Sequence, residues 1–258
     1  DHHHRTGRRS DDRHPSLIGG EDLIQVSGVC SRPGPLINGS FETEVTLGEN
    51  LQKGDLYREV SEDTFDSVLN PDVLPTGTGY NCSFTLDGTY LAIAHNTSPF
   101  ITIYKRNGNT FTKLTDPSSL PTRSGWACSF APDGTYLAVG SFDSPYVLIY
   151  KRDGDTFTKL ADPNVLPTGN SFGCSFTSDG TYLAVASYAS PYVLIYKRAG
   201  DTFTKLTDPD IFPTSMSRSC SFTSDGMYLA LGHTGTPYIT IYKRDGDTFT
   251  KLANPSVL

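Results

Sequence analysis

One block of sequence occurs four times in this chain at a constant interval of 46 residues. Cys82, Cys128, Cys174 and Cys220 mark equivalent positions, and each opens a stretch that closely resembles CSFTSDGTYLAVAS, residues 174–187. Residues 129–162 and 175–208 are identical at 27 of 34 positions. Tandem copies with a period of about 40 to 50 residues are typical of propellers and of helical arrays. The block must therefore fold as a unit that packs against its own copies.

The residue chemistry of the block decides between strands and helices. Each copy contains four short runs rich in Tyr, Val, Ile, Phe and Thr, which from Cys128 onward read CSF, TYLAVGS, YVLIYKR and TFTKLAD. Such runs favour strands. Asp133-Gly134 separates the first run from the second, and Asp153-Gly154 separates the third from the fourth. Because Asp-Gly is a strong hairpin signal, the block predicts four antiparallel strands, and the array predicts an all-β fold, a β-propeller of four-stranded blades.

The amino-acid sequence of the block also resembles that of a known family. SFAPDGTYLAVGS followed by YVLIYKR is similar to a blade of WD-repeat and YncE-type propellers, over roughly residues 63–258. The resemblance implies the propeller architecture and is weak for function. The Trp-Asp pair of that family is Tyr150-Lys151 here, and its Gly-His pair is absent. The side-chain tetrad that braces many WD blades therefore cannot form, and we expect aromatic and β-branched packing between neighbouring sheets to hold the blades together.

The predicted organisation has three parts. Residues 1–14 are a disordered or processed lead, residues 15–60 a small N-terminal β segment, and residues 61–258 the propeller blades. Residues 63–81 match the end of a block, so four blades come with an extra outer strand. The last copy stops at PSVL, where earlier copies continue toward another cysteine. We expect an array that is incomplete at its C-terminus, or partial rings from separate chains that self-assemble through their blade edges.

Composition removes several classes of partner. The formal net charge of −7, with no basic stripe, lacks the phosphate-neutralising surface of a nucleic-acid binder. The sequence contains no run of about 18 apolar residues, so it predicts no membrane-spanning helix. The four cysteines that recur with the block are expected to be separately buried thiols. We expect no metal site and no cofactor.

Variation between the copies is concentrated at one end of the predicted blades. The hairpin turns repeat almost unchanged, whereas the links before each cysteine read GTGYN, RSGWA, GNSFG and SMSRS. In a propeller these links share one face, here called the top rim, with the links between second and third strands. Aromatic and Arg side chains favour contacts with partners, and sugar rings stack on aromatic faces; packing into the gaps between blades is the alternative. The candidate ligand-binding residues are Tyr80, Trp126, Phe172, Arg218, His95, Phe142, Tyr188 and His233.

Other polar residues of the block have simpler explanations. His95 and His233 are expected in solvent-facing links, without a catalytic role. Lys151-Arg152 and its copies are expected to be solvated strand ends. Asp153, Asp155 and Asp247 resemble a sparse set of calcium ligands, but the Asp-Gly-Asp hairpin already explains them, and no loop offers the about six to eight ordered oxygens that calcium needs.

The functional hypothesis from these observations is a non-catalytic protein. Familiar catalytic motifs are missing from the sequence, and near-identical blades argue against catalysis, which on propellers usually combines residues from different blades. Residues 45–60 are briefly similar to a β element of phage tail and other particle proteins. We expect a structural or binding module of an extracellular particle or surface assembly, such as a phage tail or filament component in a virion, presenting the top rim to a glycan or protein. The alternative is a cytoplasmic scaffold for protein partners.

Overall fold

A computed structural model describes residues 23–28, 41–46 and 70–254 of the chain. The chain divides into two compact units, residues 1–65 and 66–258. In the first unit, β1 (Leu23–Gly28) pairs antiparallel with β2 (Phe41–Thr46), with Leu23 opposite Thr46. The predicted lead at residues 1–14 and the start of the extra outer strand at residues 63–69 lie outside the described residues.

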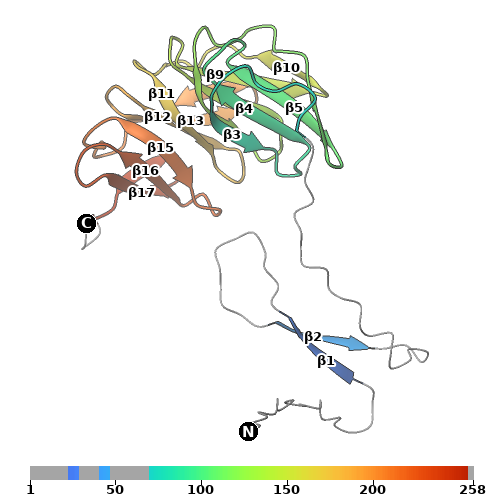
Figure 1. Cartoon of the computed structure of the whole chain (residues 1–258). Coiled ribbons are helices and arrows are strands. Elements are labelled where there is room, and N and C mark those ends of the chain that lie inside the picture. The colour runs from blue at the N-terminus through green and yellow to red at the C-terminus, as the bar shows by residue number, and fades with distance from the viewer. Residues whose placement is uncertain (1–22, 29–40, 47–69, 255–258) are drawn as a thin grey trace, which may run out of the picture. The chain divides into compact units, whose positions relative to one another are not determined.

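The second unit is a β-propeller of four antiparallel four-stranded sheets, which follow one another in chain order (Figure 1). No helix occurs among the described residues, so the predicted all-β propeller is confirmed. Blade 1 consists of β3 (Gly79–Phe84), β4 (Tyr90–His95), β5 (Ile101–Asn107) and β6 (Thr110–Lys113). Blade 2 consists of β7 (Gly125–Phe130), β8 (Tyr136–Ser141), β9 (Val147–Asp153) and β10 (Thr156–Lys159). Blade 3 consists of β11 (Ser171–Phe176), β12 (Tyr182–Ser187), β13 (Val193–Ala199) and β14 (Thr202–Lys205). Blade 4 consists of β15 (Ser217–Phe222), β16 (Tyr228–His233), β17 (Ile239–Asp245) and β18 (Thr248–Lys251).

The two Asp-Gly hairpins form, with one shift from the sequence prediction. Asp153 pairs with Thr156, so the residues between β9 and β10 are Gly154 and Asp155 rather than Asp153 and Gly154. Gly134 and Gly154 take positive φ values of 65° and 55°. Glycine enters this region without a Cβ clash, so it alone carries the left-handed backbone of both turns.

The hydrophobic core lies between blades. One buried cluster joins Ala92, Ile101 and Ile103 of blade 1 to Leu137 and Leu148 of blade 2, and two further clusters repeat this arrangement for blades 2 and 3 and for blades 3 and 4. Every residue of β8 and β12 is buried. The expected packing between neighbouring sheets is therefore confirmed, and each Å² of apolar surface that it covers contributes about 25 cal/mol.

A polar contact repeats at each boundary between blades, on the side of the hairpin turns. At the boundary between blades 3 and 4, the Tyr182 hydroxyl of blade 3 donates a hydrogen bond to Asp247 Oδ1 of blade 4 at 2.6 Å. Lys197 Nζ of blade 3 lies 2.8 Å from Asp247 Oδ2, and the Arg244 guanidinium of blade 4 lies 4.7 Å above the Tyr182 ring. We call this set of four residues the interblade clamp. Its other copies are Tyr90, Lys105, Arg152 and Asp155 between blades 1 and 2, and Tyr136, Lys151, Arg198 and Asp201 between blades 2 and 3.

The clamp corrects the prediction that Lys151-Arg152 and its copies are merely solvated strand ends. The Lys side chains pair with the next blade, and the Arg side chains lie over a tyrosine of the preceding blade. Each of the hairpin carboxylates Asp155 and Asp247 accepts one hydrogen bond from a tyrosine hydroxyl and one from a lysine ammonium. The Lys197 and Asp247 side chains are about half exposed, at 44% and 48%, so solvent weakens their ion pair. The Tyr182 ring is buried, so its hydroxyl bond to the carboxylate is the stronger part of the clamp.

We predict that Tyr182→Phe destabilises the protein more than Lys197→Met. The first change removes a hydrogen bond between a buried phenol and a carboxylate, a loss on the order of 1–2 kcal/mol of unfolding free energy. The second removes an exposed ion pair and leaves the apolar stem in place. Urea unfolding of both variants measures the difference, and a larger loss in Lys197→Met would contradict this ranking.

The clamp also predicts a pH dependence. Hydrogen bonds from Lys197 and Tyr182 lower the pKa of Asp247. A carboxyl whose folded pKa lies below its unfolded value of about 3.9 contributes stability above that pH and loses it as pH falls through the folded pKa. We expect Asp247→Asn to be less stable than the unchanged protein at pH 7, and the gap between their unfolding free energies to shrink below about pH 4. A gap that stays constant down to pH 2 would show that the carboxylate charge is unimportant.

Candidate ligand-binding rim

Four of the predicted site residues lie within strands, not in exposed links as the sequence suggested. Tyr80, Trp126, Phe172 and Arg218 are each the second residue of an inner strand, β3, β7, β11 and β15. In β3, Gly79 pairs with His95 and Asn81 with Ala94, which leaves Tyr80 at a break in the register. The same break occurs in the other three blades. A β-bulge of this kind turns one side chain away from the regular alternation.

The bulged side chains contact one another across the blade boundaries. Tyr80 and Trp126 stack with ring centroids 4.1 Å apart and planes inclined by 12°. Trp126 meets Phe172 edge to face at 5.4 Å, and the Arg218 guanidinium lies 4.6 Å above the Phe172 ring. We call these four residues the aromatic row. It is continuous over all four blades.

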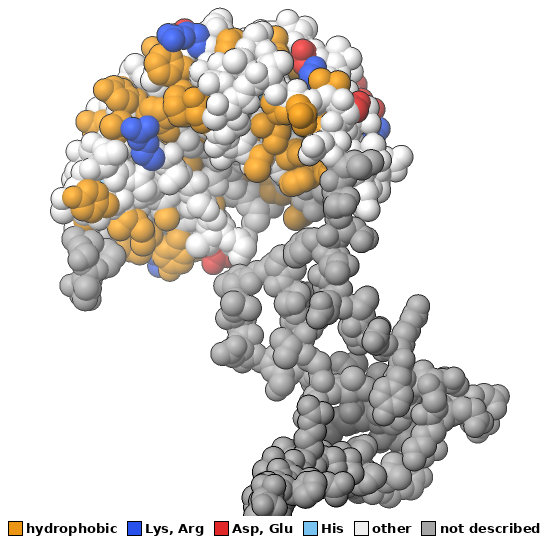
Figure 2. Space-filling model, viewed as in Figure 1, with side chains coloured by type: hydrophobic (Ala, Val, Ile, Leu, Met, Phe, Trp, Pro, Cys, Tyr) orange, Lys and Arg blue, Asp and Glu red, His pale blue; other side chains and the backbone are white. Residues whose placement is uncertain are grey.

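The sequence left open whether these side chains pack between blades or lie at the surface, and the row does both. Its members pack against their neighbours, which contributes about 0.5–1.5 kcal/mol per aromatic pair. Tyr80 nevertheless remains 39% exposed, Trp126 and Phe172 are half-buried, and Arg218 is exposed. Apolar side chains reach the propeller surface in several other groups, with Lys or Arg between some of them (Figure 2). The row is distinguished from these by its continuity and by mutual contacts that hold each ring in place.

The remaining aromatic candidates divide between two places. Tyr188, which is 53% exposed, meets Phe172 edge to face at 6.4 Å and so extends the row. Phe142 belongs to a separate pair, in which the Arg123 guanidinium lies 4.6 Å above its ring. The structure therefore unites five of the eight predicted residues, and Phe142 is not among them.

The two histidines are buried, so the expectation of solvent-facing positions is wrong. His95 ends β4 and His233 ends β16, with exposures of 0% and 6%. Nε2 of His95 lies 2.9 Å from Oγ1 of Thr102, and Nε2 of His233 lies 3.0 Å from Oγ1 of Thr240. Burial lowers the pKa of His95. Both side chains are held inside their own blades, because the second strand continues one residue past the point where the polar link seemed to begin.

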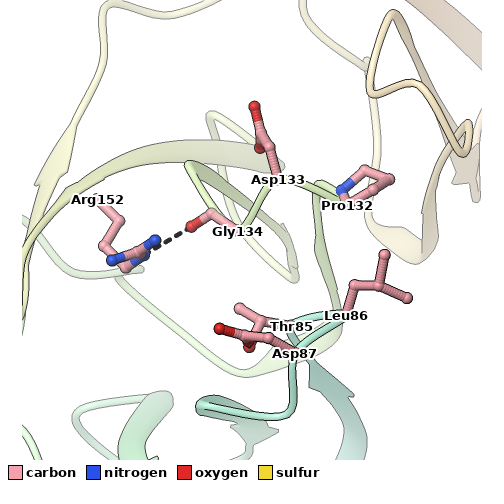
Figure 3. Close-up of a pocket in the computed structure, with 7 residues that line it drawn as sticks. All are labelled: Thr85, Leu86, Asp87, Pro132, Asp133, Gly134 and Arg152. Carbon is pink, nitrogen blue, oxygen red and sulfur yellow. Dashed lines mark hydrogen bonds between the residues drawn. The ribbon is translucent and has the colours of Figure 1, made fainter.

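A hollow lies among the hairpin turns, where the near-identity of the four copies gave no indication of a site. It is lined by Thr85, Leu86, Asp87, Pro132, Asp133, Gly134 and Arg152 (Figure 3). Arg152 Nε donates to the Gly134 carbonyl at 2.7 Å. Hydrogen bonds from Thr85 and Thr89 lower the pKa of Asp87 to about 2, so this carboxylate is ionised at neutral pH and occupied in holding its own turn. The hollow is formed by turn-bracing groups.

The cysteines only partly follow the prediction of buried thiols. Cys128 is buried and Cys174 and Cys220 are half-buried, but Cys82 is exposed, because no blade of the described part of the chain covers that face of β3. Burial raises the pKa of the Cys128 thiol. Within residues 70–254 and the two N-terminal strands, no cluster of three His, Cys, Asp or Glu side chains is placed to hold a metal ion. The same residues include no helix that could cross a membrane.

Comparison with known proteins identifies the fold. No protein-family model matches the chain, and no curated protein matches it. Among solved structures, a periplasmic gluconolactonase of Pseudomonas aeruginosa is 17% identical with a TM-score of 0.56, over 72% of this chain and 60% of that one. A protein of Bacteroides uniformis assigned as a 6-phosphogluconolactonase is 17% identical with a TM-score of 0.52, over 67% of this chain and 53% of that one. Hydrazine synthase of Kuenenia stuttgartiensis is 16% identical with a TM-score of 0.51, over 66% of this chain and 47% of that one.

These similarities support the propeller fold and correct one functional expectation. The chain spans about half to three fifths of the length of these three proteins. Propellers that share its fold include a gluconolactonase, and this finding contradicts the prediction of a non-enzyme, because the fold also occurs in enzymes. Uniform blades were a poor argument for that prediction, since the residues that differ between copies converge in the aromatic row.

Proposed function

We propose that the aromatic row binds a ligand that contains a sugar ring. The observation that carries this proposal is the continuity of Tyr80, Trp126, Phe172 and Arg218 across four blades, with part of each ring open to solvent. Rings already fixed by their neighbours lose little conformational freedom when a ligand stacks on them, which lowers the cost of binding.

The chemistry of the row favours particular glycans. The Tyr80 end offers a flat aromatic face, whereas Arg218 and its five N–H donors at the other end suit hydroxyl, carboxylate or phosphate oxygens. A glycan that carries one acidic substituent satisfies both ends. The net charge of the chain, −7, would disfavour binding of a glycan that carries many negative charges.

The wider role proposed for this surface is recognition of a glycan or protein by an extracellular particle or surface assembly, such as a phage tail or filament component. Support comes from the concentration of sequence differences on the top rim and from the similarity of residues 45–60 to particle proteins. A cytoplasmic scaffold that presents the same rim to a protein partner is the alternative. We also propose that the blades are of the WD or YncE type, on the strength of their SFAPDGTYLAVGS and YVLIYKR segments.

Glycan binding is directly measurable, because Trp126 is the only tryptophan of the chain. We expect a glycan array to detect binding, and titration with the strongest glycan to change Trp126 fluorescence. Tyr80→Ala should weaken binding about tenfold or more, because an aromatic at the centre of a contact surface is a typical hot spot.

Two further variants complete this test. Trp126→Ala, followed by calorimetry, should also reduce binding, whereas Leu86→Ala, at an exposed side chain among the hairpin turns, should leave it unchanged. Equal affinity in Tyr80→Ala, Trp126→Ala and the unchanged protein would remove the row from the binding site.

Hydrolysis of a sugar lactone is a second candidate function. It is favoured by the gluconolactonase that shares the fold and by the suitability of the row for a sugar ring. We expect gluconolactone to be hydrolysed faster than its spontaneous rate, followed as acid release at constant pH, and Trp126→Ala to lower kcat/KM about tenfold. A rate equal to the spontaneous one would eliminate this candidate and leave the binding proposal to be decided by the glycan measurements.

A further inference from the structure

Blade 1 has an uncovered face where the other blades meet a neighbour. Phe84 is 50% exposed, whereas its equivalents Phe130 and Phe176 are only 6% and 8% exposed because the preceding blade covers them. Leu91 and Ile93 are half-buried, although the corresponding Leu137 and Val139 of blade 2 are completely buried. We call this the leading face of the propeller.

The leading face contains a hollow of about 390 Å³, lined by Phe84, Gly88, Arg106, Gly108, Asn109 and Phe111. At the next boundary the equivalent position holds the ring of Tyr90. That ring lies 6.2 Å from Phe157 and 4.5 Å from the Arg152 guanidinium, and its hydroxyl donates to the Gly154 carbonyl at 3.2 Å. The hollow is therefore a tyrosine socket that no tyrosine of the described residues enters.

Blade 4 has the complementary uncovered face. Tyr228, Ala230, Ile239 and Ile241 are half-buried, whereas Tyr136, Ala138, Val147 and Ile149, at the same positions in blade 2, are buried by blade 3. Within the described chain, the Tyr228 hydroxyl and the exposed Lys243 ammonium have none of the clamp contacts that Tyr182 and Lys197 make. We call this the trailing face.

The first and last blades do not close on each other in the described structure. Inner strands pack in the pairs β3 with β7, β7 with β11 and β11 with β15, but β15 and β3 make no comparable contact among the described residues. Within the described residues, no other blade covers either face.

We propose that two copies of this chain bind head to tail, with Tyr228 of one copy in the tyrosine socket of the other. The structure shows this same interface at three internal boundaries, so its shape and chemistry are known. Tyr228 would lie under the Arg106 guanidinium and donate to the Gly108 carbonyl, while the apolar faces of blades 4 and 1 would cover each other. The proposal is independent of any ligand on the aromatic row.

One difference from the internal boundaries is informative. The clamp carboxylate, Asp155 in blade 2 and Asp247 in blade 4, is replaced in blade 1 by Asn109. Asn109 offers its amide oxygen to the Tyr228 hydroxyl, but it cannot neutralise Lys243. The interface between copies therefore lacks the ion pair of the internal boundaries, which makes it weaker than they are and reversible.

The propeller geometry limits the size of the assembly. Two copies contribute eight blades, which lies within the usual range of about four to eight for closed propellers. A head-to-tail contact that closes on itself gives a ring, and one that does not close gives an open chain. We expect the closed pair to be the main associated species.

The test is sedimentation equilibrium of the full 258-residue chain over a range of concentrations. Tyr228→Ala should raise the dissociation constant more than about tenfold, because it removes the central aromatic of the contact. Asn109→Asp should lower the dissociation constant by about two- to fivefold per contact at low salt, and high salt should reduce this gain. Lys243→Met combined with Asn109→Asp should remove the salt-dependent part of the gain, since the new carboxylate then lacks its ammonium partner, and should keep the part that comes from the Tyr228 hydroxyl.

Controls make each outcome decisive. Val165→Ala removes an exposed apolar side chain from the link between blades 2 and 3, away from both open faces, and should leave association unchanged. Thermal unfolding of each variant confirms that it folds, and Asn109→Asp, at an exposed turn, retains the fold. A chain that remains monomeric at all concentrations and in Asn109→Asp would overturn the proposal, as would an association indifferent to both Tyr228→Ala and Asn109→Asp. Larger assemblies that respond to both variants would keep the interface and replace the closed pair by an open chain.

Discussion

Contact between neighbouring blades is the interaction on which this structure depends. The apolar faces of β8 and β9 are covered only because blade 3 lies against them, as shown by the joint cluster of Val147, Ile149 and Leu183. Where the described residues include no following blade, the same positions are only half-buried, as Ile239 and Ile241 show in blade 4. Each copy therefore requires a neighbour for its stability, which is the general property of repeat proteins.

The interblade clamp explains why the hairpin turns differ so little between copies. Asp247 accepts hydrogen bonds from Tyr182 and Lys197, Gly246 supplies a carbonyl to Tyr182, and Arg244 covers its ring. Asp247, Gly246 and Arg244 contact the preceding blade through Tyr182 and Lys197, so a change in one copy disturbs a boundary. The bulged position of an inner strand is less restrictive, because different side chains there make the contact across the boundary, a stacked pair for Tyr80 and Trp126 and an edge-to-face pair for Trp126 and Phe172. The uniform side of the propeller is the more constrained one, and on the varied top rim several different side chains make contacts across the boundary and still present different surfaces.

The architecture was predictable from the sequence, but the clamp and the site geometry were not. The 46-residue period and four β-rich runs are local signals, and they suffice for a propeller. Tyr90 and Asp155, by contrast, lie 65 residues apart, so only packed blades reveal their hydrogen bond. His95 was misplaced because polar Asn96 and the following residues suggested a link. A usable signal existed: the copies with His at this position have Thr seven residues later, Thr102 and Thr240, whereas the copies with Ser have Leu.

The aromatic row shows how near-identical blades produce an asymmetric surface. The same bulge occurs in every inner strand, yet Tyr80 and Trp126 stack almost parallel, Trp126 and Phe172 meet at 84°, and Arg218 ends the series with a charge. Ring size and shape at one position per copy set these differences, because the backbone pairing around the bulge is the same. A ligand would therefore meet a flat aromatic face at one end and a cation at the other, which fixes its orientation. Since each member of the row belongs to a different blade, its spacing is set by the packing between neighbouring blades.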